Sequence, residues 1–165
     1  MQLEKIFHSF GLSASLAELV TVLLVMLAIA VIFWLAVGKK RLHNSVMNIY
    51  LSFALVQVLP IDLIGTSKNL PVLIFLILLV LLTLIGRYTF DIGLSGSGLA
   101  YWQIFLMSFF EVGAIFSVVA TFLGDKQLLQ YVSKDALFYF TSPWAKFSWL
   151  TLPLLFLIYI NKSND

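Results

Sequence analysis

Long apolar runs separated by short polar segments dominate this chain. A helix needs about 20 mostly apolar residues to cross a bilayer, because about 30 Å of hydrocarbon is crossed at 1.5 Å per residue. Four runs meet this length and a fifth nearly does, which predicts an all-α, polytopic transmembrane helical bundle of four to five spans with short loops. The predicted spans lie near residues 16–37, 45–64, 70–86, 99–123 and 143–160.

Residues 1–14 carry a different pattern, which predicts a short amphipathic helix at the membrane interface. Leu3, Ile6, Phe7 and Phe10 follow the spacing of one helix face, with polar residues between them. A short helix with one apolar stripe lies in the plane of the interface rather than across the bilayer.

Start signals precede the first and the last predicted spans. Ser15 and Glu18 have the spacing of a capping box, in which a hydroxyl and a carboxylate satisfy free N–H groups. Ser142 is expected to cap the last helix, with Pro143 at its first position. Pro153 predicts a kink there, because proline lacks an N–H and crowds the preceding turn. This last run is expected to span the membrane, and a re-entrant or surface-lying segment is the alternative.

The basic residues Lys39, Lys40 and Arg41 form the densest positive cluster of the chain. Cytoplasmic loops carry an excess of Lys and Arg, so we expect this loop in the cytoplasm and the N-terminus outside. The predicted location is the cell membrane, as a multi-pass protein. The cluster could also contact anionic lipid headgroups, and the alternative is a topology signal alone.

The composition agrees with lipid as the main solvent. Hydrophobic residues make up 61% of the chain and charged residues 11%, whereas soluble domains carry about 25% charged residues. The 165 residues predict a single membrane domain with no soluble module. A formal net charge of +2 is too small to suggest a nucleic-acid partner. The absence of cysteine excludes disulfides and thiolate metal sites.

Glu111 is the one acidic residue near the middle of a predicted span. Placing an acidic side chain at that depth costs at least ~2.5 kcal/mol, so Glu111 should face protein or water rather than lipid. One hypothesis is a proton or cation site. The alternative is a protonated glutamic acid that is hydrogen-bonded between helices and serves packing only.

Two amides in the second predicted span are candidate partners for Glu111. Asn48 and Gln57 can each donate to a carboxylate or accept from a carboxylic acid. Asn48 lies near the cytoplasmic end of its span and Gln57 lies closer to the middle of the membrane. Depth therefore favours Gln57, although it is turned away from the face that carries Ser45, Asn48 and Ser52. Separate helix–helix hydrogen bonds are the alternative.

Small residues form a candidate helix-packing face in the same span as Glu111. Their spacings of four, three and four place Gly113, Ser117, Ala120 and Gly124 on one side. Small residues at such spacings let helix backbones approach closely in lipid. Gly113 is about 200° around the helix from Glu111, so we expect the span to be covered on both sides. The cover could come from the same chain or from an oligomer contact.

Catalytic and cofactor motifs do not emerge from the sequence. The segment GLSGSG at 93–98 lacks the Lys-Ser or Lys-Thr that completes a phosphate-binding loop, and it predicts a flexible reversal between spans. The chain has neither an HExxH nor a GxSxG motif. We therefore expect no enzyme activity, no cofactor and no metal site.

Three features in order resemble the colicin V production protein family of small bacterial inner-membrane proteins. They are a span that ends in the basic turn Gly38–Arg41, the uninterrupted apolar run 70–86, and the GLSG turn at 93–96 before a span with small residues. The resemblance covers roughly residues 25–125 and implies a four-span protein linked to secretion or the envelope. The turn continues as SGLAYW rather than with the family's acidic–basic pair, and Glu111 has no counterpart in the family pattern. No catalytic residue is implied.

Two functions from different classes follow. The first is a helical scaffold or assembly component of a membrane complex, which forms homo-oligomers or joins a larger assembly and is linked to secretion or the envelope. The alternative is a small transporter or channel component that uses Glu111 as a proton- or cation-responsive group.

Overall fold

The computed structural model describes residues 14–37, 42–60, 65, 67, 69–89, 100–130 and 132–163. All regular secondary structure in these ranges is helical, which confirms the all-α prediction. The helices are α2 (Ala14–Val37), α3 (Leu42–Val58), α5 (Leu70–Thr89), α6 (Tyr101–Leu123), α7 (Asp125–Leu128), α8 (Lys134–Thr141) and α9 (Pro143–Ser163). The predicted interfacial helix, apart from residue 14, and the basic cluster at 39–41 lie outside the described residues.

Three helices are long and apolar enough to cross a membrane, and they indicate a membrane protein. Their apolar segments are Leu16–Leu35 in α2, Tyr101–Leu123 in α6 and Pro143–Lys162 in α9. The segment Leu70–Ile85 of α5 is also apolar but shorter. The last predicted span therefore has the length and composition to cross.

The second predicted span forms a shorter helix than expected. The sequence predicts a run to residue 64, but α3 ends at Val58, and Leu59 and Pro60 lie outside it. Proline disfavours the helical conformation of the residue before it, so Pro60 explains this end. A helix of 17 residues is about 26 Å long, which is less than the hydrocarbon core.

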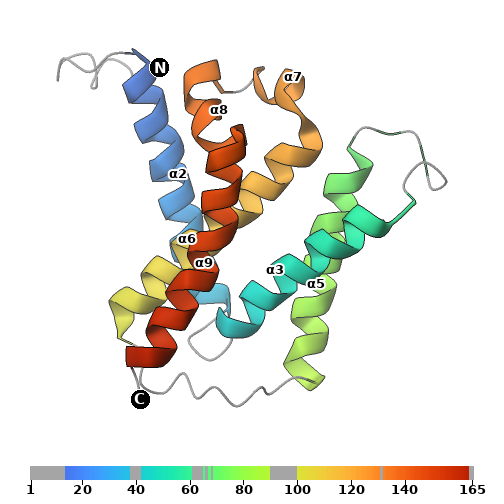
Figure 1. The fold of residues 1–165 in the computed structure, drawn as a ribbon, viewed down its shortest axis with the longest axis vertical. Coiled ribbons are helices and arrows are strands. Elements are labelled where there is room, and N and C mark those ends of the chain that lie inside the picture. Colours follow the sequence, from blue (N-terminus) through green and yellow to red (C-terminus); the bar gives the residue numbers. More distant parts are fainter. Residues whose placement is uncertain are drawn as a thin grey trace.

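The central element of the bundle is α6, with neighbours on both sides. Its most extensive contacts are with α2 and α9, and it also packs against α3 and α8. α3 and α5 form a second pair beside this group, and α3 is strongly inclined to α5 (Figure 1). The covering of α6 on both sides is confirmed, because eleven of its residues, on faces all around the helix, are buried.

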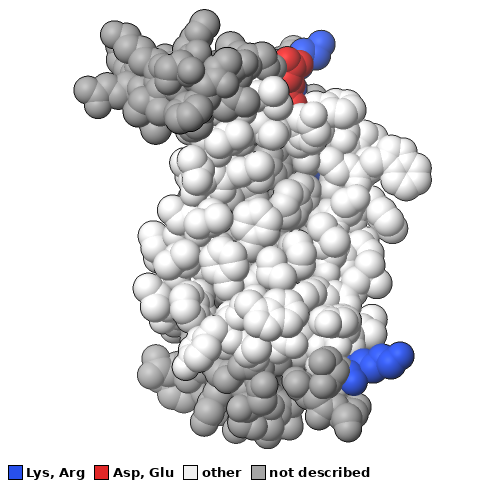
Figure 2. All heavy atoms as spheres, turned by 90° about the vertical axis from the view of Figure 1, so that its left-hand side faces the viewer, with Lys and Arg blue, Asp and Glu red and all other residues white. Residues whose placement is uncertain are grey.

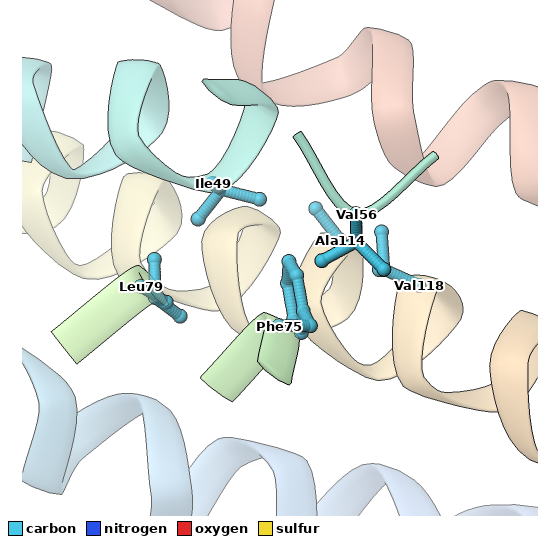
Figure 3. Close-up of a cluster of buried hydrophobic side chains, with 6 residues drawn as sticks. All are labelled: Ile49, Val56, Phe75, Leu79, Ala114 and Val118. Carbon is cyan, nitrogen blue, oxygen red and sulfur yellow. The ribbon is translucent and has the colours of Figure 1, made fainter. Parts of the chain in front are cut away.

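A well-packed apolar cluster joins α3, α5 and α6. Branched and aromatic side chains from the three helices converge in it, and Phe75 at its centre has no exposed surface (Figure 3). Its buried members are Ile49, Val56, Phe75, Leu79, Ala114 and Val118. Close packing of this kind fixes how the α3–α5 pair sits on α6.

The outer surface of the bundle is apolar along most of its length. Leu35 and Ile32 of α2 are 72% and 65% exposed, and Ile77 of α5 is 59% exposed. On the face in Figure 2 the described charged side chains gather near the two ends, with a broad uncharged band between them. A continuous apolar surface of this extent is unfavourable in water and matches lipid tails.

The start of α9 agrees with its sequence signals. The Ser142 hydroxyl accepts a hydrogen bond from the backbone N–H of Ala145 at 3.3 Å, and Pro143 is the first helical residue. Pro153 lies inside this helix. Three residues before it, the backbone carbonyl of Leu150 accepts a hydrogen bond from the Tyr50 hydroxyl of α3. Neighbouring side chains commonly satisfy the backbone around a proline in membrane helices.

The capping box predicted for α2 is not formed. Ser15 lies within α2, which already includes Ala14, so Ser15 does not precede the helix. Glu18 instead accepts a hydrogen bond from the backbone N–H of Ser133 at 2.6 Å, at the start of α8. A long-range donor thus takes the place of the local N–H, because α8 packs directly against α2.

Candidate buried carboxyl site

Glu111 lies on α6 with none of its surface exposed. Two groups of α3 act on its carboxyl: the hydroxyl of Ser45 approaches it, and Tyr50 lies within electrostatic range. The side chain thus faces the α3 side of α6 and is enclosed by protein rather than by lipid.

Neither carboxyl oxygen of Glu111 has a hydrogen-bond partner of normal geometry within the described structure. The Ser45 hydroxyl is near, but the contact does not meet that geometry. Tyr50 cannot supply a proton either, because its single O–H is donated to Leu150. An enclosed acid with neither a donor nor a cation beside it among the described side chains is unusual, because buried polar groups are nearly always hydrogen-bonded.

Two buried serines near this interface also lack partners. The hydroxyl oxygens of Ser108 on α6 and Ser52 on α3 make no hydrogen bond to the described residues. The contrast with threonine is clear, because four threonine hydroxyls donate to the backbone carbonyl four residues earlier. These are Thr21, Thr83, Thr121 and Thr141. The same local bond is open to a helical serine, but neither Ser52 nor Ser108 forms it in the described structure.

The two predicted amide partners do not reach Glu111. The side chain of Gln57 is exposed, and the Asn48 amide donates to the Thr83 hydroxyl of α5 at 3.4 Å. Asn48 therefore joins α3 to α5. The choice of Gln57 from its depth assumed helices that stand upright in the membrane, whereas α3 is inclined (Figure 1). Ser45, in the first turn of α3, approaches Glu111 instead.

The predicted small-residue face is filled from within the same chain. The indole of Trp149 on α9 covers Gly113 so closely that a Cβ atom there would overlap the ring. The Ser117 hydroxyl donates to the Phe140 carbonyl of α8 at 3.3 Å. Ala120 packs against Leu128 and Leu137.

Gly124 has a different role from the other three small residues. It ends α6 with a φ of 72°, a conformation that glycine adopts at low cost, and its N–H donates to Ala120 at 3.2 Å. The sequence left open whether this face of α6 is covered by the same chain or by another copy. In the structure the same chain covers it.

Sequence reasoning identified Glu111 but missed Ser45, Ser108 and the bond of Tyr50 as parts of its surroundings. Ser108 lies three residues before Glu111, and this helical spacing was a readable signal. The hydrogen bond from Tyr50 to Leu150 joins residues 100 positions apart, and no local sequence pattern predicts it.

Comparison with protein-family models, with curated proteins and with solved structures finds no match to this chain. Two of the three features that resemble the colicin V production protein family fall on residues 38–41 and 93–96, outside the described structure. The fold and the site define a small membrane protein whose described part is all-helical and encloses the carboxyl of Glu111. Within the described ranges, no three His, Cys, Asp or Glu residues cluster in a way that could hold a metal ion.

Proposed function

We propose that this chain is a multi-pass cell-membrane protein that acts as a small transporter or channel component, with Glu111 as its proton- or cation-responsive group. The main support is the Glu111 carboxyl, which is fully enclosed and has no hydrogen-bond partner in the described structure. An ionisable residue held at membrane depth is expensive, and such residues commonly mark ion or proton pathways.

We further propose five crossings with the N-terminus outside and the 39–41 loop in the cytoplasm. α2, α5 and α9 run in one direction in Figure 1, and α3 and α6 return in the other, which supports an alternating path. The 20 residues of α5 give about 30 Å of helix, enough to cross. α3 would cross as a short, inclined helix.

The test is proton and cation flux through the purified protein in liposomes. Glu111→Gln keeps the shape of the side chain and removes its charge, so we expect flux to fall to the level of empty liposomes. Asp135→Asn is the matched control, because it removes an exposed carboxyl at the start of α8. A Glu111→Gln protein that inserts normally and retains full flux would contradict the proposal, as would a wild-type protein without flux under any ion or pH gradient.

The second candidate function is a scaffold or assembly component, linked to secretion or the envelope by the family resemblance alone. The face of α5 that points away from α3 favours it, because Leu73, Ile77, Val80 and Leu84 line an exposed apolar groove. The Gly113 face no longer supports this function, since it is covered within the chain. Here Glu111→Gln would leave function intact, and chemical crosslinking in mild detergent would show a defined oligomer or larger complex.

A further inference from the structure

Three side chains with oxygen atoms converge where the start of α3 meets the middle of α6. Glu111 and Ser108 lie three residues apart on α6, so their Cβ atoms are about 5–6 Å apart on one face. Ser45 of α3 presents its hydroxyl to the Glu111 carboxyl from the facing helix. All three side chains are buried, with exposed fractions of 2% for Ser45 and 0% for the other two.

Most of the bonding capacity of these atoms is unused. Both Glu111 carboxyl oxygens and the Ser108 hydroxyl lack a hydrogen-bond partner in the described structure. A hydroxyl oxygen has two lone pairs and a carboxylate has about four acceptor positions, so Glu111 and Ser108 offer several free oxygen electron pairs. Carboxylate and hydroxyl oxygens are hard ligands, which suit alkali and alkaline-earth cations rather than soft transition metals.

We propose that one dehydrated monovalent cation, for which Na⁺ is the ion tested below, binds here, held by the Glu111 carboxylate and the hydroxyl oxygens of Ser45 and Ser108. This proposal deepens the function proposed above and rests on it. The charge balance selects a monovalent ion. One carboxylate neutralises one positive charge, whereas a divalent ion would leave a net charge in an apolar interior at a large energetic cost.

The other ionisable side chains that the structure describes on the helices around α6 do not change this balance. Tyr50 of α3 is the one that acts on Glu111, and its hydroxyl is bound to Leu150. The other charged residues whose side chains the structure describes lie toward helix ends. They are Glu18 on α2, Lys134 and Asp135 on α8, and Lys146 and Lys162 on α9.

Proton and cation would therefore compete for the same carboxyl. When one Na⁺ enters, one proton leaves Glu111, and the site stays neutral in both states. Binding should be saturable at one ion per chain and should weaken as the pH falls. This exchange of a proton for Na⁺ explains how Glu111 responds to protons and cations in the proposed transporter.

The test measures binding of radioactive Na⁺, and the Na⁺-dependent rise in melting temperature, with the full-length protein in detergent at mildly alkaline pH. A ligand that binds only the folded state stabilises it by RT ln(1 + [L]/Kd), so the melting temperature should rise with the Na⁺ concentration. We expect Ser108→Ala and Ser45→Ala each to weaken Na⁺ binding about 10- to 100-fold, the range for losing one bond to a charged group. Glu111→Gln should abolish binding.

Ser52→Ala is the matched control for the two serine variants. Ser52 is also a buried α3 serine without a partner, but it lies seven residues beyond Ser45, about 10 Å along the helix. Its removal should leave Na⁺ binding unchanged. Equal weakening by all three serine variants would overturn the assignment of ligands.

The outcomes separate this site from the proposed function. A wild-type protein with Glu111-dependent proton flux but no saturable Na⁺ or Li⁺ binding would refute the cation site and leave the proposed function standing. Binding that depends on Glu111, Ser45 and Ser108 without any flux would support the site and overturn the transport function.

Discussion

The indole ring of Trp149 on α9 lies directly on the backbone of Gly113 on α6. The ring is also stacked on Phe140 with centroids 5.6 Å apart, and its N–H donates to the Tyr139 carbonyl at 3.1 Å. One side chain therefore joins α6, α8 and α9, and it does so because residue 113 has no side chain.

Gly113→Ala should destabilise the bundle by about 1–3 kcal/mol, the usual cost of forcing an extra methyl group into a packed contact. The Cβ would displace Trp149 and break its bond to Tyr139. The measurement is the free energy of unfolding in mixed micelles. Gly65→Ala is the control, because the nearest atom to a Cβ there is 3.4 Å away and little should change. Equal stability of Gly113→Ala and the wild type would show that Trp149 does not sit on residue 113.

Tyr50→Phe should weaken the link between α3 and α9 by removing the hydrogen bond to the Leu150 carbonyl. Hydrogen bonds between membrane helices contribute roughly 0.6 kcal/mol on average and up to about 1.7 kcal/mol. The loss should be visible in unfolding experiments and in faster amide exchange in the turn before Pro153. Tyr159→Phe, at an exposed position on α9, should have no effect. If both variants behaved alike, the bond would not contribute to stability.

Glu18→Ala should loosen the start of α8, because the backbone N–H of Ser133 loses its acceptor. Hydrogen exchange at Ser133 should become faster in this variant. Glu18→Gln retains an acceptor oxygen and should protect the amide nearly as well as glutamate does. Protection at Ser133 that is unchanged in Glu18→Ala would mean that α8 is held without this contact.

The apolar runs predicted the helices well because span length and composition are local properties. α5, α6 and α9 begin within two residues of their predicted starts, and the Ser142 cap was readable from the sequence. The end of α3 was missed although Pro60 was visible, because the apolar run continues past it.

The contacts of the site were harder to predict, because they depend on how helices cross. The depth of Gln57 along the sequence suggested a partner for Glu111, but the inclination of α3 places Ser45 there instead. Gly113 was recognised as a packing residue, whereas the identity of its partner, Trp149, follows only from the tertiary arrangement.

We propose above that the enclosed Glu111 carboxyl loses its proton when Na⁺ binds. Infrared difference spectroscopy of the membrane-embedded protein tests this most directly, by comparing spectra before and after Na⁺ addition in wild-type protein and in Glu111→Gln. We expect Na⁺ to remove a carboxylic-acid C=O band and to add carboxylate bands in the wild type. Both changes should be absent in the variant. A wild-type spectrum without such bands, or the same bands in Glu111→Gln, would contradict this proposal.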